Sequence, residues 1–193
     1  MNTRILPSLD ELNAELKRSR YRRRYKAALR GTTVILILIA VAAMAASFLF
    51  LSVMQVDGTS MSPLLQNGDI IVALKGSQVL TGDVAAFYFN DKLLVKRVIA
   101  QGGDEVSILP NGTVSVNGAT LDETYVSEKT LGDCDITFPY QVPAERLFVL
   151  GDQRSVSLDS RHDAIGCVAP EQMIGRVVLR IWPLKQITLF QNP

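Results

Sequence analysis

The sequence predicts a mainly β domain, barrel-like or built from several sheets, that follows a single N-terminal transmembrane helix. Two observations support this prediction: one uninterrupted apolar run, and a later series of short β-like runs separated by turn residues. Helical periodicity is absent after the apolar run, except for a turn near residues 170–173. A chain of 193 residues with 48% hydrophobic content can bury the core of one ordinary domain plus an appendage.

The apolar run covers residues 33–54 and contains no charged residue and no proline. About 20 apolar residues at about 1.5 Å each span a hydrocarbon core of about 30 Å. A basic cluster at residues 17–30 precedes the run, and the positive-inside rule holds that side in the cytoplasm. We therefore expect a basic cytoplasmic tail (1–32), a single-pass anchor (33–54) in the plasma membrane and an extracytoplasmic domain (55–193).

A cleavable signal peptide is the alternative interpretation of this run. Such a peptide has an apolar region of about 7 to 15 residues that ends in a small-x-small site. Here the run is longer, and its alanines lie in the middle rather than at the end. The pattern favours an uncleaved anchor.

Charge and cysteine content exclude several classes of protein. Residues 1–30 carry a net charge of +6 and the remainder −5, which argues against nucleic-acid binding by the domain. One histidine and two unclustered cysteines do not form a zinc site, and we expect no metal and no cofactor. Cys134 and Cys167 can form a disulfide or remain buried thiols, and the sequence leaves both open.

Short β-like runs follow the anchor. Asn-Gly pairs at 111–112 and 117–118 bracket one of them, which is typical of hairpins because Asn-Gly accepts positive φ at little cost. Residues 104–142 are more polar and less regular, so we interpret them as a β-rich insertion. The expected strands lie at residues 69–74, 84–89, 93–100, 113–116, 146–150 and 175–182.

Lys96 is a candidate general base. Strand alternation places Leu94, Lys96 and Val98 on one apolar face, where burial lowers the pKa of an amine. A neutral amine can take the proton of a serine hydroxyl. Taken alone, Lys96 could equally lie at a strand edge with its ammonium in water.

Ser60 is a candidate nucleophile because Gly58 permits an unusual backbone before it and the residues after it can anchor the turn. One serine in isolation means little. No G-x-S-x-G elbow is present, and His162 is the only histidine. A lysine base therefore fits the composition better than a Ser-His-Asp triad, and we assign His162 no role.

Several short boxes of sequence occur in a fixed order along the chain. They are Gly58-Thr59-Ser60-Met61-Ser62-Pro63-Leu64, Asn67-Gly68-Asp69, Gly82-Asp83-Val84, Val95-Lys96-Arg97-Val98-Ile99-Ala100, Gly151-Asp152-Gln153-Arg154 and Ser157-Leu158-Asp159-Ser160-Arg161. In order and spacing, these boxes closely resemble those of type I bacterial signal peptidases. The resemblance covers roughly residues 33–184 and includes the preceding anchor.

The resemblance implies a membrane-anchored serine endopeptidase with a signal-peptidase-like β fold. Its substrates would be the signal peptides of exported preproteins, cut after a small-x-small site beside the lipid bilayer. Its oligomeric state stays open. By position in the boxes, the resemblance assigns Ser60 as nucleophile, Lys96 as general base, Ser157 as the residue that orients the lysine amine, Asp159 and Arg161 as a structural ion pair, and Arg97 as a supporting residue.

The sequence departs from the family pattern at three positions. Gln153 stands where the family usually has Asn, and Val156 where Asn is frequent, so turn geometry there is in question. Gly58 cannot supply the side-chain hydroxyl that some members use in the oxyanion hole. We therefore expect the hole to use backbone donors at Ser60 and Gly58, since one donor can be worth about 2.7–4 kcal/mol.

Two expectations concern the surroundings of the site. An extended peptide can add to a strand edge, and we expect residues 55–58 and 93–95 to border its side-chain pockets. Trp182 could enter the lipid headgroup layer, which tryptophan favours, or could pack in the core at a strand end.

Three competing classes of protein differ from this interpretation in specific features. A peptide-binding β domain would need no catalytic pair. A self-cleaving repressor protease, also of the Ser/Lys type, would carry a DNA-binding domain where this chain has an apolar span. A signal peptidase of the histidine type would have His at position 96, where this chain has lysine.

Overall fold

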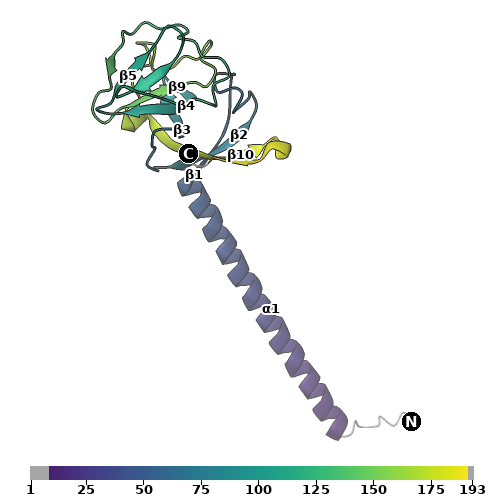
Figure 1. Ribbon diagram of the computed structural model, residues 1–193. Helices are drawn as coiled ribbons and strands as arrows, with labels where there is room; N and C mark the ends of the chain where they lie inside the picture. Colours follow the sequence, from purple (N-terminus) through teal and green to yellow (C-terminus); the bar gives the residue numbers. More distant parts are fainter. Residues whose placement is uncertain (1–8, 191–193) are drawn as a thin grey trace. The chain divides into compact units, whose positions relative to one another are not determined.

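The structure is a computed structural model that describes residues 9–190, so the first eight residues of the predicted tail lie outside it. The chain divides into two compact units, Met1–Phe48 and Leu49–Pro193. The described part of the first unit is helical, and the second unit contains every β-strand that the structure describes (Figure 1).

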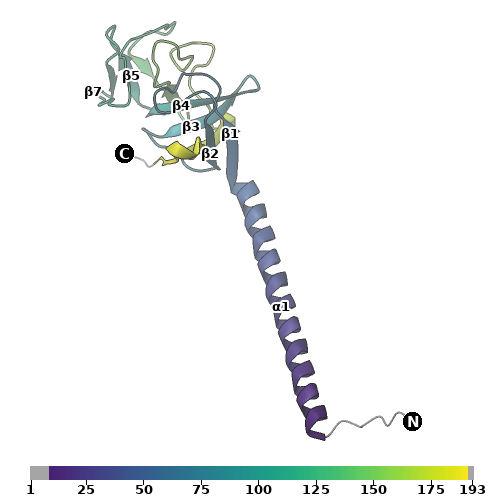
Figure 2. The same ribbon diagram turned by 90° about the vertical axis from the view of Figure 1, so that its right-hand side faces the viewer.

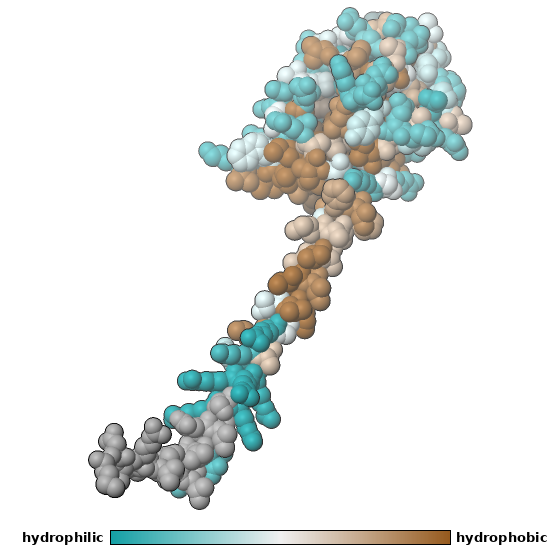
Figure 3. Space-filling view, turned by 180° about the vertical axis from the view of Figure 1, so that it is seen from behind, coloured by the Kyte–Doolittle hydropathy of each residue, from teal (hydrophilic) through white to brown (hydrophobic). Residues whose placement is uncertain are grey.

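Helix α1 (Leu9–Phe50) is continuous over 42 residues. Its Arg20–Phe50 portion is long and apolar enough to cross a membrane, and none of its most apolar stretch is buried. A hydrophilic stretch is followed along the helix by an apolar one (Figure 3).

The end of the expected anchor differs from the structure. The helix stops at Phe50, and β1 (Leu51–Gln55) begins at the next residue. Met54 pairs with Ile71 and is 8% exposed, whereas Val53 is 63% exposed. The last four residues of the predicted span therefore belong to a strand, in which Met54 packs in the core.

The larger sheet has seven antiparallel strands in the order β1-β2-β10-β3-β4-β9, with β11 paired to β10. Short 3₁₀ turns, η1 (Pro170–Gln172) and η2 (Leu184–Gln186), flank β10. The other strands are β2 (Ile70–Lys75), β3 (Val84–Phe89), β4 (Lys92–Gln101), β9 (Leu147–Leu150), β10 (Met173–Trp182) and β11 (Thr188–Leu189).

The smaller sheet lies within the predicted insertion. Its strands are β5 (Glu105–Ile108), β6 (Val114–Val116), β7 (Ala119–Thr120) and β8 (Tyr140–Gln141), in the order β7-β6-β5-β8. Asn117 and Gly118 turn the chain between β6 and β7 with φ of 52° and 78°, as Asn-Gly hairpin chemistry requires. In both ribbon views β5 lies at the far side of the domain from β1 (Figures 1 and 2).

The mainly β fold class is confirmed, in its multi-sheet form. Each of the six expected strands overlaps an observed one, namely β2, β3, β4, β6, β9 and β10. β1, β5, β7, β8 and β11 were not expected from the sequence. Three of these strands, β1, β7 and β8, lie at the edge of a sheet, and β11 pairs with β10 beside the main strand order. These four strands are defined by their pairing, not by an apolar run of their own.

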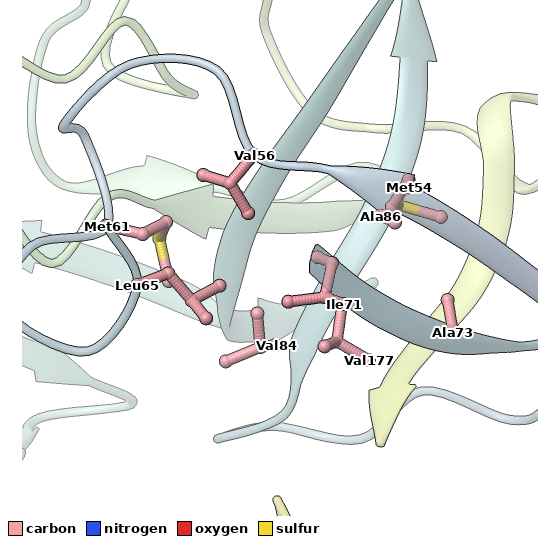
Figure 4. Packing of buried hydrophobic residues seen from close by; sticks show 9 residues of the cluster. All are labelled: Met54, Val56, Met61, Leu65, Ile71, Ala73, Val84, Ala86 and Val177. Carbon is pink, nitrogen blue, oxygen red and sulfur yellow. The ribbon is translucent and has the colours of Figure 1, made fainter. Parts of the chain in front are cut away.

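Three apolar clusters hold the domain together. The first joins β1, the loop after it, β2, β3 and β10; Figure 4 shows its side chains converging. The second joins the insertion to β4 and β9, and so fixes the smaller sheet to the larger one. The third lies on the other face of β3 and β4 and contains both Leu94 and Val98, as the alternation around Lys96 predicts.

Candidate active site

Ser60 lies in a loop that leaves the sheet after β1 and returns to it at β2. The β1–β2 ladder continues past the strands through Val56 N–H to the Asp69 carbonyl at 2.8 Å, so the ends of the loop are fixed. Met61 and Leu65 anchor its interior, since they are 1% and 0% exposed (Figure 4). Ser60 itself stays partly exposed, which suits a side chain that must meet a substrate.

Lys96 is buried in β4, opposite Ala85 of β3, with 3% of its surface exposed. Burial lowers the pKa of its ammonium from 10.5 to about 8. Asp159 and Asp152 act in the opposite direction, while Arg161 adds to the lowering. An appreciable fraction of Lys96 is therefore neutral near pH 7 to 8, as a general base requires.

The turn after β9 joins these two residues. β9 pairs with β4 through Leu150 and Arg97, and one more residue in the same register places Gly151 opposite Lys96. Gln153 N–H donates to the Ser60 carbonyl at 3.0 Å. A Cβ at Gly151 would lie 2.6 Å from the same carbonyl and would overlap Ser157 Oγ. Ser60, Lys96 and Ser157 therefore meet around Gly151.

Ser157 is 4% exposed, and its Oγ is one of three buried side-chain polar atoms without a hydrogen-bond partner in the described part of the chain. Burying an unpaired hydroxyl costs free energy, so such an atom calls for an explanation. The hydroxyl lies close enough to the Asp159 carboxylate to help lower the pKa of that group, and its lone pairs remain available to an amine N–H. This observation supports the sequence-based assignment of Ser157.

Asp159 and Arg161 form a fully buried ion pair, in agreement with the expectation. Arg161 Nε and Nη2 donate to the carboxylate at 2.8 and 2.9 Å, and Gly151 N–H donates to it at 3.0 Å. Burial raises the pKa of Asp159, but the hydrogen bonds and charge of Arg161, together with hydrogen bonds from Gly151 and Ser157, outweigh burial and hold this pKa below its usual value. The pair thus fixes the backbone of Gly151.

Arg97 makes a second buried pair, with Asp152. Its Nε and Nη2 donate to the two carboxylate oxygens at 2.9 and 2.7 Å, a bidentate geometry that joins β4 to the turn after β9. The sequence marked Arg97 as a supporting residue but did not indicate its partner. The Tyr125 ring, from the insertion, lies 3.9 Å from the Arg97 guanidinium carbon.

A third buried pair, Arg154 with Glu123, was missed from the sequence. Arg154 Nη2 donates to the Glu123 carboxylate, and its Nε donates to the Gly151 carbonyl at 3.0 Å. The only available signal was the arginine itself, because a buried guanidinium needs an anion. With 19 acidic residues in the chain, the sequence could not select Glu123.

The two expected oxyanion donors differ in availability. Among the hydrogen bonds of the described residues, none uses the Ser60 N–H. The Gly58 N–H donates to Asn67 Oδ1 at 3.0 Å and is engaged, because the asparagine closes the base of the loop. Gly58 can serve as the second donor only if Asn67 releases it.

The departures from the family pattern do not disturb this turn. Gln153 makes its contact with Ser60 through its backbone, so the identity of its side chain does not affect that hydrogen bond. Val156 is 62% exposed and points away from the buried groups.

A cavity of about 30 Å³ adjoins Ser60. Its lining comes from the two segments expected to border substrate pockets: Gln55, Val56 and Asp57 on one side, and Leu93, Leu94 and Val95 on the other, with Ser60 and Met61. One water needs about 10–15 Å³ of such space, so only a small side chain fits this cavity without rearrangement.

The remaining polar groups show no further catalytic cluster within residues 9–190. No three His, Cys, Asp or Glu side chains among them gather closely enough to hold a metal ion. Cys134 and Cys167 are free thiols. The hydrogen bonds of His162 are made by its backbone, and its Nδ1 is buried without a partner, so it forms no Ser-His-Asp triad with the described residues.

Comparisons with known proteins agree with this geometry. A family model described as "Signal peptidase, peptidase S26" matches residues 29–182. A signal peptidase I of Bacillus caldolyticus is 37% identical over 68% of this chain and 79% of its own length. A signal peptidase IB of Staphylococcus aureus is 35% identical over 72% of this chain and 81% of its own length.

A crystal structure of a signal peptidase I from Enterococcus faecalis is 28% identical, with a TM-score of 0.43, and covers 52% of this chain and 97% of that one. The family match extends over well more than half of the sequence and includes all the residues of the candidate active site. The chain therefore belongs to the signal peptidase family, peptidase S26, as a type I member and a serine peptidase.

Proposed function

We propose that this protein is a membrane-anchored endopeptidase that removes signal peptides from exported preproteins, with Ser60 as nucleophile and Lys96 as general base. The observation that carries the proposal is a buried lysine with a pKa of about 8 in the corner of the fold where the Ser60 backbone and the Ser157 hydroxyl meet. The relatives with which this chain aligns are named as signal peptidases.

The reaction begins when Lys96 Nζ takes the proton of Ser60 Oγ as this oxygen attacks the scissile carbonyl. The Ser60 N–H binds the resulting oxyanion, and Lys96 returns the proton to the leaving amine. A water, activated by Lys96, then hydrolyses the acyl-enzyme. Ser157 Oγ orients the Lys96 amine throughout.

Substrate selection would depend on the small cavity beside Ser60. An extended peptide next to residues 55–57 and 93–95 places alternate side chains towards the domain. A cavity of about 30 Å³ admits an alanine-sized group and excludes larger ones. This restriction would produce cleavage after a small-x-small site.

The location of the site would match the location of the substrate. The basic residues of α1 are exposed and precede its apolar stretch, which favours a cytoplasmic N-terminus and an extracytoplasmic domain. Ser60 lies nine positions after Leu51, where β1 begins immediately after the helix. Holding enzyme and substrate in the same thin layer replaces a three-dimensional search with a local one.

The bilayer would also contact the domain itself. Trp182 is 51% exposed, so the alternative that it packs in the core is wrong. Exposed apolar residues accompany it, and Figure 3 shows that apolar surface gathers in one region of the domain. The accompanying residues in this segment are Leu184, Ile187 and Leu189.

The test is cleavage of a preprotein in lipid vesicles by the wild type and by Ser60→Ala, with the cut site read by mass spectrometry. The proposal expects cleavage after a small-x-small site by the wild type and none by a folded Ser60→Ala. A second preprotein, with a bulky residue directly before the cut, should resist the wild type. Cleavage by Ser60→Ala at the wild-type rate would remove Ser60 from the mechanism.

A further inference from the structure

We propose that Glu123 and Tyr125, in the insertion, are positioning residues of the reaction centre: they hold the Gly151–Arg154 turn against β4 and so set where Ser60 and Ser157 lie relative to Lys96. The inference rests on the proposed function and assigns a role to the insertion. We call these two residues the brace.

The contacts of the brace close a ring around the turn. The Tyr125 ring lies over Arg97, the residue next to Lys96 in β4. The Tyr125 hydroxyl donates to Glu123 Oε1 at 3.3 Å. Glu123 binds Arg154, and Arg154 Nε donates to the Gly151 carbonyl at 3.0 Å. The ring closes through Asp152, which accepts two hydrogen bonds from Arg97.

This ring encloses the residue around which the reaction centre meets. Gly151 directly follows Leu150, which pairs with Arg97, and a Cβ on Gly151 would overlap the Ser60 carbonyl and Ser157. The next residues of the turn, Asp152 and Gln153, make the Arg97 pair and the hydrogen bond to Ser60. Shifts of the turn therefore move the catalytic groups together, and a misplacement of about 1 Å can cost about 100-fold in rate.

The brace can fix the position of the turn because the ion pair between Glu123 and Arg154 is shielded from water. Glu123 and Arg154 are each 2% exposed, and replacing one charge would leave the other buried and unpaired. Burial and the nearby Glu123 carboxylate raise the pKa of Tyr125, so the phenol remains a hydrogen-bond donor at working pH.

The insertion is also held to the domain by apolar contacts outside the ring, so its positioning role can be tested separately from its contribution to folding. Val106, Ile108 and Val114 pack against β4 and β9 in the second apolar cluster and touch none of the ring residues through that cluster. Val114→Ala therefore serves as a matched control, because it weakens the insertion by truncating a fully buried side chain and leaves the ring intact.

The experiment compares the full-length wild type with Tyr125→Leu, Tyr125→Phe, Glu123→Gln and Val114→Ala in preprotein cleavage, with Tm measured for each. Tyr125→Leu and Glu123→Gln should lower kcat at least about tenfold with KM within about twofold. Tyr125→Phe keeps the ring over Arg97 and should stay within about threefold of wild type. Val114→Ala should lower Tm and keep kcat.

The pH profile distinguishes positioning from simple loss of stability. The charged groups around Lys96 are Asp159, Asp152 and Arg161, and burial is the largest cause of its lowered pKa. A displaced turn admits water, so the acidic limb of kcat/KM should move to higher pH in Tyr125→Leu and not in Val114→Ala.

Folded Tyr125→Leu with wild-type kcat and pH profile would overturn the inference. An equal loss of kcat in Val114→Ala would also overturn it, because kcat would then only follow Tm. Glu123→Gln is expected to be less stable, so the half-buried Tyr125 provides the decisive variant if Glu123→Gln fails to fold. If the wild type cuts and Ser60→Ala is inactive, such a result contradicts only the role of the brace and leaves the proposed function standing. A wild type that does not cut contradicts the proposed function instead.

Discussion

The burial that makes Lys96 suitable as a general base also lowers the stability of the folded protein. A folded pKa of about 8, against 10.5 for the free side chain, means that burial disfavours the charged form. The unfolded chain binds more protons between these two values, so stability rises with pH across this window. Below pH 8 the full cost of burial is present, and it amounts to about 3 kcal/mol.

We therefore predict that Lys96→Met abolishes cleavage and raises the free energy of unfolding by up to about 3 kcal/mol at pH 7, because an apolar side chain of similar length removes the buried charge. The measurement is urea unfolding of both proteins at pH 7 and pH 10. The advantage of the variant should shrink at pH 10. A less stable Lys96→Met at pH 7 would show that Lys96 is not destabilised by burial.

The individual site residues could be identified from the sequence only to a limited extent. Strand alternation predicted the burial of Lys96, because period two is a local property of the chain. Ser60 had only a weak local signal, in Gly58 before it and the anchoring residues after it, and its assignment depended on the ordered boxes. Ser157 was identified from the boxes alone. Glu123 and Tyr125 were missed because their partners, Arg154 and Arg97, lie about 30 residues away in the sequence. No local sequence pattern encodes contacts over such a separation.

At the scale of elements, the short turn after β9 determines the site. Gly151 has no side chain, and this lets the turn lie against the loop that carries Ser60. The Ser60 carbonyl is backbone and cannot rotate away as a flexible side chain would. The requirement for glycine here is therefore one of space.

We predict that Gly151→Ala lowers kcat by at least about 100-fold and destabilises the domain by about 1–3 kcal/mol, because the added methyl must push the Ser60 loop away. Cleavage assays and chemical unfolding check both values. Gly103→Ala is the control, since Gly103 has a φ of 95° but open space around it. It should lose about 1 kcal/mol and keep its activity. Equal activity in the two variants would contradict the packing argument.

The strands were predicted where apolar runs are bounded by turn residues, as in β3 and β4. β1 was missed because its apolar residues continue the run of α1 without a break, so composition gives no boundary. The actual boundary is set by pairing with β2, in which Met54 lies opposite Ile71. Tertiary pairing, which the sequence does not display locally, ended the helix at Phe50.

At the scale of the whole molecule, the compact unit Leu49–Pro193 contains every group of the proposed site. It also contains β1, whose Met54 belongs to the first apolar cluster. The domain thus needs the strand that follows the helix, whereas no helix side chain whose burial the structure describes is buried.

We predict that a fragment starting at residue 49 folds cooperatively, whereas one starting at residue 56 is destabilised by several kcal/mol because β2 loses its partner and Met54 leaves the core. Thermal unfolding followed by circular dichroism, in detergent, checks both fragments. An unfolded 49–193 fragment, or equal stability of the two, would contradict this division of the chain.

The central claim is that buried Lys96 is the general base for Ser60, and the most direct measurement is kcat/KM against pH for a signal-peptide substrate. The account predicts a rate that rises about tenfold per pH unit and levels off above a midpoint near pH 8, where Lys96 becomes neutral. His162→Gln should leave this profile unchanged. A flat profile, or a midpoint that disappears in His162→Gln, would contradict the claim.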